Sequence, residues 1–249
     1  MMRLDTLLAH AGLGTRKAVK KYIRSGVVFV NDVVCKVADT HVNEKTDTIT
    51  VENRVVVFCA QTYLMVNKPP NTVCAAKDAL HQTVFSMLNE RHYNLFLAGK
   101  LHIVGRLDRD TEGLLLLTTD GQWTHKITAP KNNISKTYYV ELRDAVKATE
   151  YIDTCFACLQ VPPEGSEAGF SAKPAHVEWV SATSCYLTIY EGKYHQVKRM
   201  FAVVKNKVVF LKRVGIGSLR LDSSLALGEY RELTQDELER VVAKSDFSY

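Results

Sequence analysis

Cysteine, proline and glycine are all scarce in this chain. Its 249 residues hold six cysteines, six prolines and 13 glycines, which excludes a disulfide-stapled, a collagen-like or a low-complexity protein. The one close cysteine pair, Cys155 and Cys158, has no second pair nearby to complete a zinc site. Sparse cysteines fit a reducing compartment, so we expect a cytoplasmic protein. The chain as a whole is 46% hydrophobic and 24% charged, which is typical of a globular protein that folds without disulfide bonds.

Long apolar segments and common cofactor motifs are missing as well. The longest apolar runs, residues 55–60 and 114–117, are far shorter than the ~20 residues that span a membrane. Asp5 interrupts the start of the chain, where a signal peptide would need an apolar core. No GxxxxGK(S/T), HExxH or GxSxG motif is present, and residues 215–217 lack the third glycine of a dinucleotide loop. We therefore expect no membrane association, no metal and no cofactor.

The net charge of +5 comes from one short segment. Residues 15–26 contain five basic side chains and no acid, and the rest of the chain is balanced. At helical spacing, Val19 and Ile23 fall on one side and all five cations on the other. The five are Arg16, Lys17, Lys20, Lys21 and Arg24. Such a face is either simply solvated or binds an anionic partner, and the absence of acids favours phosphate backbones.

The residues around this segment predict a small helix–helix–hairpin unit. Thr15 is placed to cap the basic helix and Gly26 to end it in the left-handed conformation. Leucines at helical spacing precede it, and two valine-rich runs flank Asn31-Asp32 as a hairpin. The stretch resembles the alpha-L RNA-binding module found in a ribosomal protein, in tyrosyl-tRNA synthetases and in several rRNA-modifying enzymes. Thr15 and Asp32 depart from the usual Ser and Gly of that module, but both suit the same local conformations.

The remainder of the chain predicts an α+β fold. Strand-like runs outnumber helical patterns and do not alternate with them regularly, which favours a mostly antiparallel sheet with flanking helices. We expect domains at residues 1–58 and 61–249. The expected strands cover residues 63–66, 114–118, 137–142, 177–180, 186–190 and 208–211, and the expected helices 83–88, 145–158, 195–204 and 235–243.

The richest polar segment is residues 105–113, which carries three alternating acids before a leucine run. A calcium loop starting at Asp108 is excluded, because Thr119 stands where a bidentate Glu is required and four leucines fill the ligand positions. A carboxylate pair of Asp108 and Asp110 and simple turn acids paired with Arg106 and Arg109 both remain open. The buried strand that follows directly favours a functional loop on a rigid base.

Two further segments carry basic and aromatic side chains that suit RNA binding. Residues 191–213 hold seven basic side chains and one acid, which indicates a second cationic patch. Lys136-Thr137-Tyr138 begins a strand with an aromatic ring. By itself, Tyr138 fits a core position better than a base-stacking one.

Together these residues resemble the pseudouridine synthases, in particular the branch that modifies small-subunit (16S) ribosomal RNA. The resemblance runs through the amino-terminal module, residues 67–69, 105–114, 122–125, 136–138 and 191–201. It implies that Asp108 is the catalytic aspartate, that Tyr138 stacks on the target uracil and that Lys198 pairs with the aspartate, with Arg199 as the alternative. It also implies RNA contacts by Arg106, Arg109 and Arg199.

The expected activity is a cofactor-free conversion of one uridine in 16S rRNA to pseudouridine by a monomeric cytoplasmic enzyme. The expected partner is 16S rRNA or a small-subunit assembly intermediate. Two alternatives remain: a sister synthase acting on large-subunit rRNA, and a non-enzymatic ribosome-binding protein. The resemblance leaves open whether Asp108 attacks the sugar or removes a proton.

Overall fold

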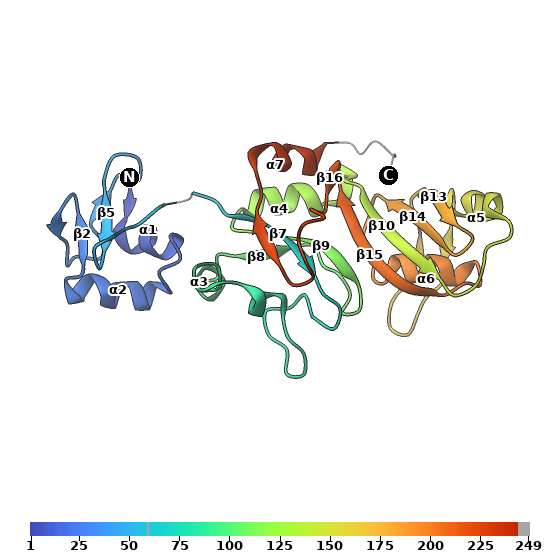
Figure 1. The fold of residues 1–249 in the computed structure, drawn as a ribbon, viewed down its shortest axis with the longest axis horizontal. Coiled ribbons are helices and arrows are strands. Elements are labelled where there is room, and N and C mark those ends of the chain that lie inside the picture. The colour runs from blue at the N-terminus through green and yellow to red at the C-terminus, as the bar shows by residue number, and fades with distance from the viewer. Residues whose placement is uncertain (59, 244–249) are drawn as a thin grey trace. The chain divides into compact units, whose positions relative to one another are not determined.

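The computed structural model describes residues 1–58 and 60–243 (Figure 1). Cys59 and residues 244–249 of the expected second domain lie outside the described residues. The chain divides into two compact units. The first comprises Met1–Tyr63, Val84–Ile103 and Leu117–Gly121, and the second Leu64–Thr83, Val104–Leu116 and the described residues from Gln122 onward. Because two later segments join the first unit, the division at residues 58 and 61 stays a prediction.

The amino-terminal residues form the predicted helix–helix–hairpin order (Figure 1). A four-stranded sheet has the order β3-β2-β5-β6, and a separate pair joins β1 to β4. The elements are β1 (Met2–Arg3), α1 (Leu4–His10), α2 (Arg16–Ser25), β2 (Val28–Val30), β3 (Val33–Val34), β4 (His41–Val42), β5 (Ile49–Val51) and β6 (Arg54–Val55).

Local chemistry sets the limits of α2 and of the hairpin. Thr15 Oγ1 accepts a hydrogen bond from the amide of Ala18 at 3.3 Å, and Gly26 ends the helix at φ 82°. Asn31 and Asp32, at φ 49° and 64°, make the two-residue turn between β2 and β3. These three predictions from sequence are confirmed.

Within the described residues the largest sheet has nine strands. Its path is β13-β14-β10-β15-β9-β7-β17, with β16 beside β15 and β8 beside β9. Most of the pairs are antiparallel, whereas β9 and β15 run parallel. This confirms the mostly antiparallel α+β fold. The strands are β7 (Tyr63–Lys68), β8 (His102–Val104), β9 (Glu112–Thr118), β10 (Lys136–Leu142), β13 (His176–Ser181), β14 (Ser184–Ile189), β15 (Val208–Ile216), β16 (Leu219–Arg220) and β17 (Tyr230–Glu232).

Helices flank this sheet, with α6 packed on β15, α5 on β13 and α7 on β16 (Figure 1). A two-stranded pair of β11 and β12 lies outside the sheet. None of the described helices is long and apolar enough to cross a membrane. The remaining elements are η1 (Val84–Met87), α3 (Glu90–Leu97), α4 (Gly121–Thr128), η2 (Pro130–Asn132), α5 (Thr149–Phe156), β11 (Gln160–Val161), β12 (Phe170–Ser171), α6 (Gln196–Val203) and α7 (Gln235–Val242).

The helix expected at residues 145–158 is too long, because α5 has only eight residues. Helix α5 begins only at Thr149, because the segment before it is tied to another part of the fold. The amide of Val146 donates to the carbonyl of Ala182 at 2.7 Å, in the turn between β13 and β14. Sequence patterns also missed α3, although Asn89 accepts a hydrogen bond from the amide of His92 as a regular N-cap.

The strand that follows the polar segment, β9, contributes to the hydrophobic core beside the sheet. Leu114, Leu115 and Leu116 of β9 are fully buried. Gly113, at φ 98°, begins this run next to β15, and a Cβ there would lie 2.3 Å from the carbonyl oxygen of Arg213. Only glycine therefore permits this close approach, which holds the preceding loop at the edge of a rigid strand.

Candidate functional site

Asp108 lies in the loop between β8 and β9. The amide of Thr111 donates to the carbonyl of Asp108 at 3.2 Å and closes a tight turn. On the other side, the amide of Leu107 points to Sγ of Cys74 at 3.4 Å. These contacts, on a loop that leads into a fully buried strand, leave the backbone on both sides of Asp108 with little freedom.

A fully buried lysine holds the same loop through hydrogen bonds to its backbone. Lys68, at the end of β7, donates through Nζ to the carbonyls of Arg109 at 3.1 Å and Thr111 at 2.9 Å, and to Pro69 at 2.9 Å. Burial lowers the pKa of Lys68 below its ordinary value, since the charged form loses its hydration. In the sequence, residues 67–69 were noted only as part of the family resemblance, with no role given to Lys68. A lysine at the end of an apolar strand was the signal that sequence reasoning missed.

Helix α6 brings a cation to Asp108 from 90 positions later in the chain. Nζ of Lys198 lies 3.0 Å from Oδ2 of Asp108 and 2.6 Å from Oδ1 of Asp110. Burial alone would lower the pKa of Lys198, but hydrogen bonds to both carboxylates raise it above its usual value. For Asp110, burial would raise the pKa, but the hydrogen bond from Lys198 lowers it. Lys198 is therefore a stable positive charge between two acids.

A small pocket adjoins Asp108. It has a volume of about 70 Å³, and its walls include Asp108, Tyr138 and Ile189. Tyr138 is only 8% exposed and sits on β10 between Leu187 of β14 and Arg213 of β15. The sequence left open whether Tyr138 is a core residue or a base-stacking residue. In the structure its ring is packed like a core residue and also forms a wall of the pocket.

A wider hollow of about 660 Å³ shares part of this lining. Its lining includes Arg106 and Lys193, which also line the small pocket, and adds Tyr194 and Lys198, so cationic side chains lie around the approach to Asp108. Phosphate groups are the natural partners of such a surface. The described residues contain no cluster of three His, Cys, Asp or Glu side chains placed to bind a metal.

His195 is a site residue that sequence reasoning did not single out. It precedes α6 in the left-handed conformation, at φ 48°, and its Nε2 lies 3.8 Å from Oδ2 of Asp108. Positive φ is uncommon for residues other than glycine, so the unusual backbone at this point was a feature that the sequence pattern could not reveal.

The two arginines of the loop differ in their contacts. Arg106 is exposed and lines both the pocket and the hollow. Arg109 is exposed too, but its Nη1 lies 2.6 Å from Nε2 of His81, whose Nδ1 lies 3.1 Å from Oδ1 of Asp78. Arg106 is therefore the freer of the two to meet a phosphate group.

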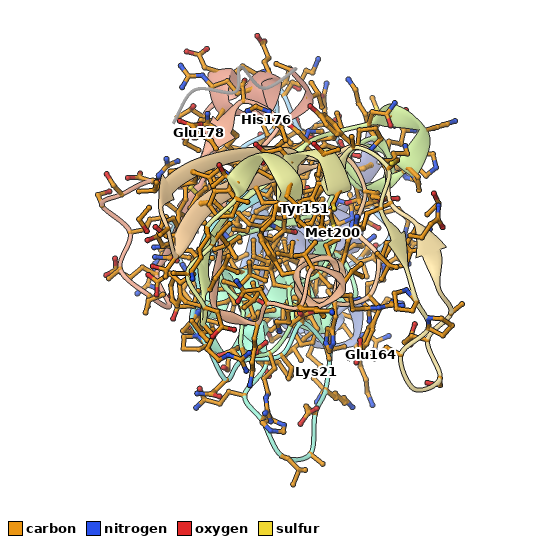
Figure 2. All side chains as sticks on the ribbon, turned by 90° about the vertical axis from the view of Figure 1, so that its right-hand side faces the viewer. Lys21, Tyr151, Glu164, His176, Glu178 and Met200 are labelled. Carbon is orange, nitrogen blue, oxygen red and sulfur yellow. The ribbon has the colours of Figure 1, made fainter. Side chains whose placement is uncertain are left out.

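Arg199 lies elsewhere than expected. Its side chain is 6% exposed, and Nη2 donates to the carbonyls of Pro162 at 2.7 Å and Ala168 at 3.0 Å. The guanidinium also packs 4.9 Å from the ring centre of Phe170. These contacts join α6 to the β11–β12 loop, from which Glu164 is labelled in Figure 2. Because Nη1 and Nη2 donate to backbone carbonyls inside the protein and Nε faces Glu164 at 3.6 Å, the expectation that Arg199 pairs with Asp108 or contacts RNA does not fit this position.

The apolar and basic side chains of α2 lie on opposite sides of the helix, as their spacing in the sequence predicts. Val19 and Ile23 are fully buried, whereas four of the cations, Arg16, Lys17, Lys21 and Arg24, are exposed. Lys20 is the exception, since its Nζ lies 4.0 Å from Oδ2 of the buried Asp5. The exposed four are spaced along one helix and can each meet a separate phosphate.

Comparison with known proteins points to one family and one small domain. Residues 62–203 match RNA pseudouridylate synthase, and residues 2–49 match the S4 domain. The uncharacterized RNA pseudouridine synthase YtzG of Bacillus subtilis is 42% identical, across 95% of this chain and 97% of that protein. Ribosomal small subunit pseudouridine synthase A of Vibrio cholerae is 41% identical, across 95% of this chain and 98% of its own. The crystal structure of a pseudouridylate synthase, 41% identical, superposes with a TM-score of 0.65 and covers 97% and 100% of the two chains.

Proposed function

We propose, since the chain belongs to the RNA pseudouridylate synthase family, that it isomerises one uridine of small-subunit (16S) ribosomal RNA with Asp108 as its catalytic carboxylate. The observation that carries this proposal is the contact of Lys198 with Asp108, which lines the same pocket as Tyr138. Several near full-length relatives named ribosomal small subunit pseudouridine synthase A support the choice of RNA.

The reaction breaks the bond between N1 of uracil and C1′ of ribose and makes a new bond from C5 to C1′. The proton on C5 is lost and N1 gains one, so nothing is oxidised, reduced or hydrolysed overall. An isomerisation of this kind needs no cofactor and no external energy source. Asp108 acts as nucleophile or base through its carboxylate, and the ammonium of Lys198 lies 3.0 Å from Oδ2 of that group.

The pocket supplies the environment that this chemistry needs. The target base must leave its stack, which costs a few kcal/mol, and stacking on an aromatic ring returns about 1–3 kcal/mol per base. Tyr138 offers such a ring beside Asp108, with Ile189 as a further apolar wall. We propose that uracil enters this pocket and stacks on Tyr138 while Arg106 binds a flanking phosphate.

The amino-terminal S4 domain binds RNA, and we propose that α2 provides the contact surface. Its exposed cations and the lack of acids on that face fit a phosphate backbone. The domains are proposed as residues 1–58 for RNA binding and 61–249 for catalysis. We propose that the enzyme is a cytoplasmic monomer acting on 16S rRNA or on a small-subunit assembly intermediate.

The test is to map pseudouridine in the ribosomal RNA of a strain that lacks this protein. Carbodiimide-dependent stops of reverse transcription should disappear at one position of the small-subunit RNA and return on complementation. Loss of a site in the large-subunit RNA instead would identify the sister-branch enzyme. An unchanged pattern in both RNAs would contradict the proposed function.

A further inference from the structure

We propose that Tyr194 and His195 form a stacking shelf for the nucleobase next to the isomerised uridine. The inference rests on the proposed function, because it takes the pocket at Asp108 as the place of the target base. His195 lines both the small pocket and the wider hollow, whereas Tyr194 lines the hollow alone, so the Tyr194 ring extends the shelf beyond the pocket of the target base.

The two rings are stacked on each other and open to solvent. Their centroids are 3.8 Å apart and their planes 23° from parallel. Tyr194 is 49% exposed, and the His195 side chain is 32% exposed. A tyrosine that lies outside the core and against a hollow bordered by cations has the properties of a base-stacking platform.

The loop that carries the rings is held rigidly by buried polar groups. Gln196 accepts from the amide of Lys193 at 2.9 Å and donates through Nε2 to Oε1 of Glu191 at 2.8 Å. The same Glu191 oxygen accepts from the amide of Lys173 at 2.9 Å. Both Glu191 and Gln196 are buried. The buried polar groups thus hold the backbone of the loop, while Tyr194 stays exposed and available to an external partner.

The backbone of His195 adds an independent indication. This residue adopts the left-handed conformation at φ 48° although it is not glycine. Strained positions of this kind concentrate where geometry serves a function. Here the conformation lets one residue lie 3.8 Å from Asp108 through Nε2 and also stack on Tyr194. The shelf is therefore next to the reacting position.

The chemistry of the surroundings identifies the ligand as a nucleobase attached to a phosphate chain. Lys193 and Arg106 line the same hollow as Tyr194 and are exposed. A ring face takes any base, because every base has a π surface, while the cations bind the phosphates on either side. The shelf should therefore add affinity with little sequence preference.

The test measures coupling between Tyr194 and the neighbouring base in the full-length chain carrying Asp108→Asn, so that binding is read without turnover. The probe is a single-stranded heptaribonucleotide with one central uridine and 2-aminopurine or an abasic nucleotide on its 3′ or 5′ side. Fluorescence anisotropy gives the Kd, and 2-aminopurine quenching reports stacking directly. Tyr194→Ala removes the ring, and Tyr194→Phe keeps it without the hydroxyl. Tyr151→Ala, at an exposed tyrosine on α5 (Figure 2), is the matched control.

We expect an abasic neighbour on one side to raise the Kd between about fivefold and about a hundredfold with Tyr194 present, and less than about twofold in Tyr194→Ala. The Tyr194→Phe and Tyr151→Ala variants should keep the full abasic penalty and the quenching. An equal penalty with and without the Tyr194 ring would overturn the shelf, as would loss of quenching in Tyr194→Phe. Retained isomerisation by the Asp108→Asn protein would instead overturn the proposed catalytic role and leave the base coupling intact.

Discussion

Replacing Lys198 by methionine removes the charge that joins Asp108 to Asp110 while keeping a long side chain. The two contacts, 3.0 Å and 2.6 Å, are charge-assisted hydrogen bonds, and each such bond contributes about 1.5–3 kcal/mol. The side chains of Lys198 and Asp108 are 26% and 28% exposed, so solvent screening favours the lower part of that range for their contact. A loss of about 2 kcal/mol in transition-state stabilisation lowers kcat/KM about 30-fold.

The assay follows from the chemistry of the reaction. Because C5 of uracil exchanges its hydrogen for the bond to C1′, tritium placed on C5 is released once per turnover. Lys198→Met should lose about 30-fold in kcat/KM by tritium release, whereas Lys198→Arg, which keeps the charge, should stay within about threefold of the wild type. Activity of Lys198→Met within threefold of the wild type would refute the electrostatic role. Equal losses in both variants would refute it as well, because they would show that shape rather than charge is required.

Lys198→Met should also change how the free energy of unfolding depends on pH. Lys198 holds the pKa of Asp110 below its usual value. A carboxyl group with a depressed folded pKa stabilises the fold above its unfolded pKa of ~3.9 and loses that contribution as the pH falls through the folded value. The wild type should therefore exceed Lys198→Met in stability near neutral pH. The difference should close in acid, as followed by urea denaturation at several pH values.

Three further substitutions test the surroundings of the site. Lys68→Met should lower the free energy of unfolding by about 2–4 kcal/mol in urea denaturation, because three backbone carbonyls lose their charged donor. The loss is partly offset, because the cost of burying an ammonium disappears. Burial lowers the pKa of Lys136 to about 8, so folding releases its proton and the wild type should gain up to about 3 kcal/mol over Lys136→Met as the pH rises from about 8 towards ~10.4. A constant difference across that range would contradict the burial argument. Reversal of the α2 charges at Lys17, Lys20 and Lys21 should weaken RNA binding and flatten its salt dependence by about 0.7 in log–log slope for each phosphate that is no longer neutralised. Unchanged affinity at low salt would show that this face does not meet RNA.

Local sequence signals predicted the parts of the fold that local chemistry decides. Thr15, Gly26 and the Asn31-Asp32 turn could be read from the chain because caps and tight turns depend on a few neighbouring residues. The shortened α5 could not, because its start depends on a bond from Val146 to a turn 36 positions away. Tertiary contacts of that kind override helical periodicity.

Local sequence patterns predicted less of the site than of the fold. The residues alone left Asp108 as one of several turn acids, and its pairing with Lys198 was expected only through the resemblance to a family. The ammonium of Lys68 reaches the carbonyls of the loop across 41 and 43 positions. No periodicity reports such distances, because they are set by the order of strands in the sheet. Arg199 shows the converse error. The sequence predicted a functional contact for this residue next to Lys198, but its side chain points into the protein.

The role of Asp108 is tested directly by comparing Asp108→Asn with Asp110→Asn in single-turnover tritium release from small-subunit RNA. Both variants keep the shape of the side chain and both remove one carboxylate from Lys198. If Asp108 is the reacting carboxylate, Asp108→Asn should release no tritium above background, while Asp110→Asn should isomerise the same uridine with a rate lowered only modestly. Release by a folded Asp108→Asn protein at a rate near that of Asp110→Asn would contradict the account.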